Sequence, residues 1–187
     1  MSREPANKNW LKPNSFRFTV LNLPAVEYFC QKANIPRIGF GAAKQTTPFV
    51  DISHIGEKIE FSELNIEFLI DEDMANYMEV LNWMYGIGFP KSHQQYTRYI
   101  QRQEHNPFAA SATPRAEAAY SDAIMYIMNN NNMPILEVRY YDIFPTNLES
   151  VDFDLRVPTA HSMTAMATFD YKFMDIVPIG KEYNPNY

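Results

Sequence analysis

The sequence contains only one cysteine and six glycines in 187 residues. Cys30 therefore has no partner for an intrachain disulfide, which excludes a disulfide-stapled scaffold. Few glycines beside 13 prolines indicate stiff connections rather than flexible linkers. Long apolar runs are also missing, since the densest, residues 123–128, is far too short to span a bilayer. The first ten residues are polar and contain no apolar signal core. The chain is therefore expected to be soluble and to have no membrane partner.

Positive charge is scarce as well. The chain has 16 Lys and Arg against 22 Asp and Glu, a net charge of -6, which opposes sequence-independent capture of nucleic-acid phosphates. A hydrophobic share of 46% is ordinary for a globular protein, and the length suits a single domain over residues 1–187. An aromatic share of 14% favours a β-rich body.

Alternation of apolar and polar side chains predicts most of the strands. The expected strands are residues 15–23, 28–33, 58–61, 64–70, 121–128, 135–142 and 162–175. An asparagine-rich turn joins 121–128 to 135–142 as a hairpin, and Pro145 is expected to end a strand. Residues 35–55 contain two prolines and two glycines and predict an extended excursion.

The apolar spacing changes from the period of a strand to that of a helix at Asp71. Asp71 is the predicted N-cap of a helix that runs to Gly86. The face expected to pack on the sheet consists of Met74, Tyr77, Met78, Leu81 and Met84. Residues 89–119 are polar and small and are expected to form an insertion or long loop. The predicted fold is mainly β (α+β), an antiparallel barrel or sandwich of about seven strands with one flanking helix.

The sequence offers no pattern typical of catalysis, of a cofactor or of a metal. The chain has four histidines, His54, His93, His105 and His161. They are too far apart in sequence to form a metal-binding motif. Cys30 is interpreted as a small buried hydrophobe rather than a nucleophile. The segment Gly39-Phe40-Gly41 lacks the third glycine of a dinucleotide loop. We therefore predict no catalytic, cofactor-binding or metal-binding residue, and a protein that is not an enzyme.

Three stretches together resemble the tail tube proteins of contractile-tailed bacteriophages. They are Asn14-Ser-Phe-Arg-Phe-Thr-Val20 with Leu23-Pro24 and Ala33-Asn-Ile-Pro36, the unit Leu64–Trp83, and Tyr141–Leu148 with Ala167–Phe173. The resemblance lies in the order and spacing of these stretches and covers nearly everything except residues 89–119.

The resemblance implies a fold related to the tubes of type VI secretion and a structural function. It implies homohexameric rings that stack into a hollow tube inside a contractile sheath, through which genomic DNA leaves the capsid without specific binding. The implied partners are further copies of the chain, the sheath, baseplate and tail terminator proteins, and the implied location is the virion tail, assembled in the host cytoplasm. Two alternatives stay open: a related protein that initiates the tube at the baseplate, and a small β-barrel that binds a ligand.

The excursion at 35–55 is the segment that we expect to reach a neighbouring subunit. It carries apolar residues on polar flanks, and the predicted arm residues are Phe40, Phe49, Val50 and Ile52. A ring subunit also needs strands with open edges, because neighbours join by pairing their main chains there. The alternative is that 35–55 is an ordered loop lying on its own body.

Overall fold

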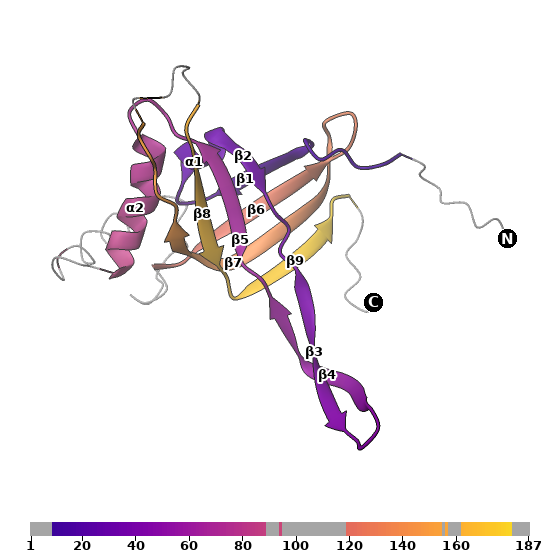
Figure 1. Cartoon of the computed structure of the whole chain (residues 1–187). Helices are drawn as coiled ribbons and strands as arrows, with labels where there is room; N and C mark the ends of the chain where they lie inside the picture. Colours follow the sequence, from indigo (N-terminus) through magenta and orange to yellow (C-terminus); the bar gives the residue numbers. More distant parts are fainter. Residues whose placement is uncertain (1–8, 89–93, 95–118, 155, 157–161, 181–187) are drawn as a thin grey trace.

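The computed structural model describes residues 9–88, 94, 119–154, 156 and 162–180. Within them the chain forms nine strands and two helices (Figure 1). The elements are β1 (Phe16–Val20), α1 (Pro24–Phe29), β2 (Cys30–Ala33), β3 (Ile38–Thr46), β4 (Asp51–Phe61), β5 (Leu64–Leu69), α2 (Ala75–Gly88), β6 (Ser121–Met128), β7 (Pro134–Leu148), β8 (Thr164–Asp170) and β9 (Phe173–Pro178). The mainly β, antiparallel prediction is confirmed, with more strands and one more helix than expected. Neither helix is long and apolar enough to cross a membrane.

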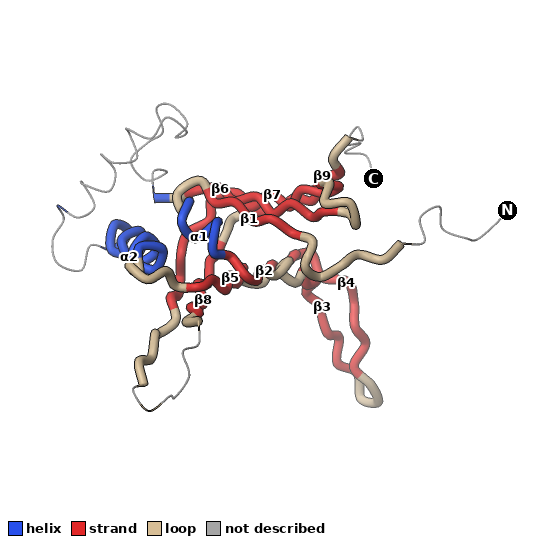
Figure 2. Tube along the Cα trace, turned by 90° about the horizontal axis from the view of Figure 1, so that it is seen from above, coloured by secondary structure: helices blue, strands red, loops and turns tan. Residues whose placement is uncertain are grey.

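Seven of the strands form one antiparallel sheet, and β3 and β4 pair only with each other. The order in the large sheet is β1-β6-β7-β8-β5-β2, and β9 also pairs with β7. Seen from above, the sheet folds into two layers, with β1, β6 and β9 in one and β2, β5 and β8 in the other (Figure 2). Strand β7 belongs to both layers, because its first part pairs with β6 and β9 and its last part with β8.

The passage of β7 between the layers occurs at Asp142, whose φ of 54° lies in the left-handed region. The Lys172 ammonium lies 3.0 Å from the Asp142 carboxylate, and the Lys172 N–H donates to the Tyr141 carbonyl at 3.1 Å. The turn between β8 and β9 is therefore fixed to the same corner. This corner divides the single strand predicted at 162–175 into β8 and β9.

Pro145 does not end a strand, contrary to the prediction. It lies inside β7, where the register against β8 shifts between Pro145 and Asn147. Such a bulge tolerates a residue without an N–H, which is why a proline fits within the strand.

The core lies between the two layers and is filled by side chains from nearly every strand. Its largest fully buried members include Tyr140, Phe18, Phe68 and Phe169. The indole of Trp83 on α2 packs against Phe169 with ring centroids 5.9 Å apart. Helix α2 is thereby packed against the β8 layer.

The buried face of α2 is not the predicted one. Its buried residues are Asn76, Val80, Trp83 and Gly86. Tyr77 and Met84 pack only partly against the core, Leu81 is half-buried, and Met78 is 44% exposed. Met74 precedes the helix with a φ of 55°. The core-facing side of the helix is thus rotated from the predicted one. Apolar residues occur on both sides of the helix, and the one that is buried carries Val80 and Trp83.

Asp71 is not the N-cap of α2. The helix begins four residues later, at Ala75, and the link from β5 is held by Asn76. The Asn76 Nδ2 donates to the Leu69 carbonyl at 2.6 Å, and the Asn76 Oδ1 accepts from the Tyr77 N–H at 2.8 Å. The predicted insertion at 89–119 lies almost wholly outside the described residues.

Candidate assembly surface

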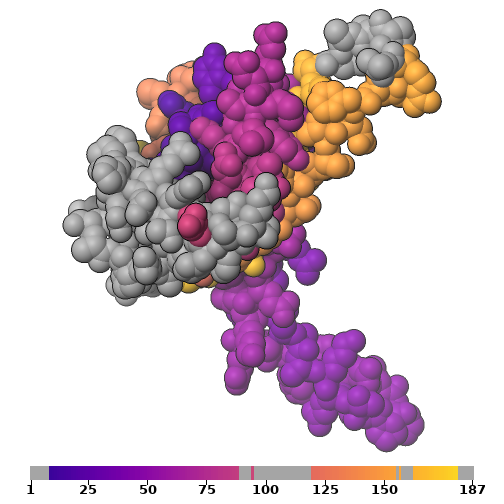
Figure 3. All heavy atoms as spheres, turned by 90° about the vertical axis from the view of Figure 1, so that its left-hand side faces the viewer, coloured from indigo at the N-terminus to yellow at the C-terminus, as the bar shows by residue number. Residues whose placement is uncertain are grey.

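The hairpin β3–β4 projects from the body as a separate arm (Figure 1). It stands clear of the remaining atoms in the space-filling view as well (Figure 3). Residues 35–55 were expected to form an excursion, and most of them lie in this hairpin, which continues to Phe61. A β-hairpin pairs its own main chain, so it holds an extended shape without resting on the body.

Large apolar side chains on this arm face solvent. The four predicted arm residues are exposed to these extents: Phe40 63%, Phe49 97%, Val50 62% and Ile52 44%. Ile38, Ile55 and Ile59 on the same hairpin are also exposed. So much apolar surface on one projecting element is typical of a surface that another protein covers.

The register of the hairpin gathers several of these residues on one face. Ile38 pairs with Phe61, Phe40 with Ile59 and Ala42 with Ile55. Directly paired residues of an antiparallel ladder point to the same side, and so do residues two apart along a strand. The inner half of the arm therefore has an apolar face that includes Phe40, Ile55 and Ile59. Ile52 pairs with Gln45 and lies on the other face, where the His54 Nε2 and the Gln45 Oε1 are joined by a 2.9 Å hydrogen bond.

Two glycines meet halfway along the arm. The register shifts between Phe40 and Ala42, so β4 carries extra residues there. A Cβ built on Gly56 would overlap the main-chain carbonyl of Gly41, whereas one on Gly41 would meet only the Lys58 carbonyl at 3.8 Å. Only glycine fits at position 56 without a shift of the backbone.

The base of the arm is anchored to the body by hydrogen bonds and aromatic contacts. The Tyr171 hydroxyl donates to the Ser62 carbonyl at 3.0 Å, and burial raises the pKa of Tyr171 to about 12, so the donor keeps its proton. The ring of Phe61 lies 6.0 Å from Tyr171 and 6.3 Å from Phe173 between centroids. The arm is therefore a fixed projection of the sheet.

The sheet also presents unpaired borders. Within the part of the chain that the structure describes, β1 pairs only with β6, β9 only with β7, and β2 only with β5. An open border exposes main-chain N–H and C=O groups that a strand of another molecule can pair with.

The described residues contain no cluster of three or more side chains suited to hold a metal ion. His54 lies on the arm. The other three histidines, His93, His105 and His161, lie outside the described residues. Cys30 is half-buried at the start of β2, and burial raises the pKa of its thiol to about 11. A thiol that stays protonated at neutral pH is a poor nucleophile.

The predicted arm residues lie on the projecting hairpin, but the exposed Ile55 and Ile59 of the same hairpin were not among them. Ile55 was assigned to the end of the excursion at 35–55, and Ile59 was assigned to a separate strand at 58–61. The sequence contains no clear signal for one continuous strand here, because the charged Glu57 stands at the same-face position between Ile55 and Ile59 and breaks the alternation.

The comparisons with known proteins agree with this geometry. The family model described as phage tail tube protein matches residues 14–175. No curated protein sequence matches the chain.

Among solved structures, the tube-terminating cap of the anti-feeding prophage is similar, with a TM-score of 0.55 and 13% identity over 94% of this chain and 95% of that chain. A similar chain is found in the sheath-tube complex of PVC, an extracellular contractile injection system, in the extended state. Its TM-score is 0.54, with 10% identity over 92% of this chain and 94% of that chain. Hcp1 from Flavobacterium johnsoniae matches with a TM-score of 0.37 and 10% identity over 94% of this chain and 99% of that chain. The first two show a shared fold.

Proposed function

The chain belongs to the phage tail tube protein family, and from this premise we propose that it is the structural subunit of a tail tube. In this proposal the chain forms homohexameric rings, and the rings stack into the inner tube of a contractile tail. The tube delivers phage DNA through its bore, and the subunit acts by assembly and not by catalysis. Its location is the virion tail, after assembly in the host cytoplasm.

The observation that carries the proposal is the exposed apolar arm on a body whose core is complete without it. The core is complete without the arm, so folding does not require Phe40, Phe49, Val50 or Ile52 to be exposed on a projection. An apolar arm that cannot fold back is stabilised when another copy covers it. The open borders β1, β2 and β9 add main-chain groups that a neighbour can pair with.

Polymerisation also follows from the kind of contact that the arm makes. An arm that meets a different surface of the next copy produces a head-to-tail interface, which closes into a ring or continues as a filament. Two such interfaces, one around the ring and one along the axis, build a tube. The other proposed partners, the sheath, baseplate and terminator proteins, meet the outside and the ends of that tube.

The bore has to let duplex DNA slide. A net charge of -6 on each subunit disfavours firm phosphate binding, because each cationic contact adds to the affinity along the duplex. Transport without specific DNA binding is therefore consistent with the composition.

Electron microscopy of the purified full chain in negative stain tests the proposal. Rings with a central hole, or stacked tubes, are expected as the protein concentration rises. A protein that stays monomeric at all concentrations and salt conditions would rule out the tube. Binding of a small molecule by that monomer would favour the β-barrel alternative.

A variant lacking residues 42–55, with a two-residue turn in their place, tests the arm itself. Asn34 and Pro36 lie outside this deletion, and both belong to the anchored base, where the Asn34 Oδ1 accepts from the Asn65 N–H at 2.6 Å. We expect a folded protein with an unchanged thermal midpoint that no longer forms tubes. Tubes of normal length from this variant would disprove the arm assignment.

A ring that ends the tube is a second candidate, supported by the fold likeness to the tube-terminating cap. The baseplate initiator remains a prediction of the same kind. A subunit that only ends or starts a tube is not expected to elongate alone, so the lengths seen in the micrographs separate both candidates from the tube subunit.

A further inference from the structure

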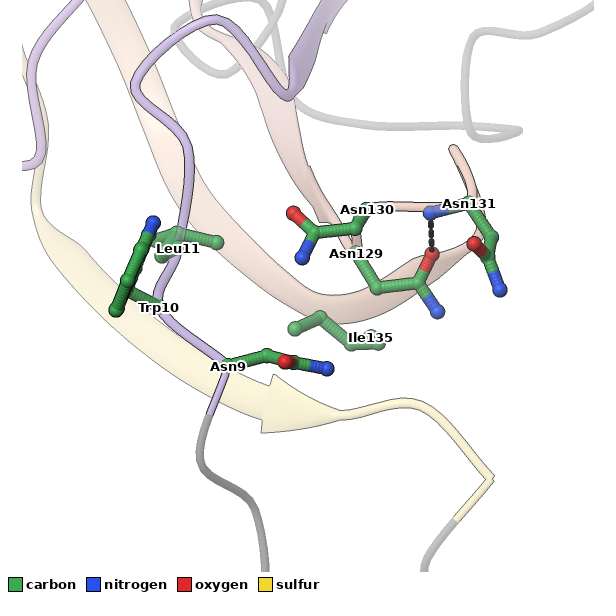
Figure 4. Close-up of a pocket in the computed structure, with 7 residues that line it drawn as sticks. All are labelled: Asn9, Trp10, Leu11, Asn129, Asn130, Asn131 and Ile135. Carbon is green, nitrogen blue, oxygen red and sulfur yellow. Dashed lines mark hydrogen bonds between the residues drawn. The ribbon is translucent and has the colours of Figure 1, made fainter.

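A hollow of about 260 Å³ lies where the N-terminal segment passes the turn between β6 and β7 (Figure 4). One side of it is apolar, formed by Trp10, Leu11 and Ile135, and the other carries the amides of the turn. Its lining residues are Asn9, Trp10, Leu11, Asn129, Asn130, Asn131 and Ile135. Trp10 is 83% exposed, so a large part of its indole is available to a partner.

The asparagine side of the hollow is already ordered. The Asn129 Oδ1 accepts from the N–H of Asn131 at 2.8 Å and from that of Met133 at 3.0 Å. The Asn129 N–H donates to the Met133 carbonyl at 2.8 Å, and Asn132 takes a φ of 58°, a conformation that asparagine tolerates. A partner can therefore bind without first ordering the turn, which lowers the entropic cost of association.

The tip of the arm has a matching shape. Thr47 closes the turn, because its N–H donates to the Val50 carbonyl at 3.2 Å and its hydroxyl accepts from the Val50 N–H at 3.2 Å. Phe49 stands at the end of this closed turn and is 97% exposed. The tip is a rigid knob with one aromatic ring.

The hollow and the knob are compatible in size and in charge. A cavity of about 150 Å³ holds a benzene molecule, so 260 Å³ holds the phenyl ring of Phe49 with part of Val50. None of the seven lining residues carries a formal charge, nor does any residue of the tip from Thr47 to Val50. Beyond them, Lys12 follows Leu11 at the hollow, while Asp51 and Lys44 are the first charged residues on the two sides of the tip, and all three are exposed.

A molecule cannot fill its own hollow. The arm extends away from the body, and in both views its tip is remote from the N-terminal segment and the β6–β7 turn (Figures 1 and 2). The hydrogen bonds and rings at its base keep it in that direction. Only the arm of another copy can reach the hollow.

We propose that Phe49 of one copy inserts into the Trp10–Leu11–Ile135 hollow of the next copy. This rests on the proposed function and deepens it, since it names the two surfaces that join neighbouring subunits. The contact is head-to-tail, and every copy offers one knob and one hollow. An aromatic knob in an uncharged hollow is the kind of contact that carries much of an interface's affinity.

Crosslinking between two single-site variants of the full chain tests the contact. Val50→Cys places a thiol on the tip and leaves Phe49 unchanged, and Asn130→Cys places one in the lining of the hollow and leaves Trp10, Leu11 and Ile135 unchanged. Native Cys30 reacts slowly at pH 7, because burial raises the pKa of its thiol to about 11. When the two variants are mixed with a short bismaleimide, we expect a crosslinked dimer that neither variant forms alone.

Two controls define the site. Phe153→Cys replaces Asn130→Cys in the first, because Phe153 is exposed but lies in the segment after β7 and outside the hollow; this pair should give no dimer. The second adds Phe49→Ala to Val50→Cys, which should lower the yield of dimer at least about tenfold, since a buried phenyl ring contributes that much to an association constant.

The outcomes also separate this proposal from the function on which it rests. Rings or tubes that form without the Val50–Asn130 crosslink overturn the contact and leave the tube function standing. A chain that neither assembles nor crosslinks overturns both. A crosslink that persists in full after Phe49→Ala overturns the role of the knob.

Discussion

Asn76 shows how one buried polar residue fixes the position of α2. Its amide is fully buried and joins the end of β5 to the start of the helix through Leu69 and Tyr77. Replacing it by alanine leaves the Leu69 carbonyl and the Tyr77 N–H without their partner at a part-buried site. Asn76→Ala should lower the free energy of unfolding by about 2 kcal/mol.

Urea denaturation followed by circular dichroism measures this loss. Asn82→Ala is the matched control, since Asn82 is exposed on the same helix and should change the free energy by less than about 0.5 kcal/mol. Equal effects of the two variants would show that the Asn76 hydrogen bonds add nothing to stability.

Cys30 gives the fold a dependence on alkaline pH. Burial raises the pKa of its thiol from 9.0 to about 11, so the folded state holds this proton more firmly than the unfolded state. The resulting stabilisation is complete below pH 9 and is lost as the pH rises from 9 to about 11.

The wild type should therefore lose more stability than Cys30→Ser between pH 8 and pH 10.5, by at most about 2 kcal/mol. Urea midpoints of both proteins at the two pH values measure the difference, and the buried tyrosines, common to both proteins, cancel. Parallel pH profiles would contradict the burial effect.

At the scale of the elements, the glycine pair of the arm allows a test without touching its apolar face. Gly56→Ala places a Cβ against the Gly41 carbonyl, so β4 must shift against β3. We expect reduced tube formation with little change of the thermal midpoint, because the arm lies outside the core. Gly41→Ala is the control, since its Cβ makes an ordinary contact at 3.8 Å and assembly should persist.

Tube length in negative stain and amide exchange of the arm measure the two effects. Normal tubes from Gly56→Ala would show that the register of the outer arm is unimportant for assembly. A lowered thermal midpoint would show instead that the arm contributes to the core.

The same elements show which parts of the fold are predictable from sequence. Strands β5 and β6 alternate cleanly between buried and half-exposed residues, and their predicted bounds are confirmed within a residue. Helix α1 was missed, because a strand was predicted up to residue 23 and another from residue 28, and Pro24 between them also suits the first turn of a helix. The corner at Lys172 was missed because alternation continues through it and its cause is the distant Asp142.

The same limit applies to the assembly surface. An apolar excursion on polar flanks is visible in the sequence, and it predicted the segment that carries Phe49. The hollow was not predicted, because Trp10 and Ile135 are 125 positions apart in sequence and only the path of the N-terminal segment beside the β6–β7 turn brings them together.

At the scale of the whole molecule, the net charge and the apolar arm act in opposite directions on assembly. Each copy carries a charge of -6, so copies repel one another at low ionic strength. The knob and the hollow are uncharged, so salt does not weaken their contact, while it shortens the range of the repulsion to about 10 Å at 0.1 M. Assembly should therefore increase from 20 to 300 mM NaCl.

Sedimentation velocity of the full chain at fixed protein concentration measures this dependence. The variant lacking residues 42–55 is the control and should stay small at both salt concentrations, because salt removes repulsion but supplies no contact. Assembly of the wild type that weakens with salt would show that ion pairs between copies, and not apolar contacts of the arm, supply most of the affinity.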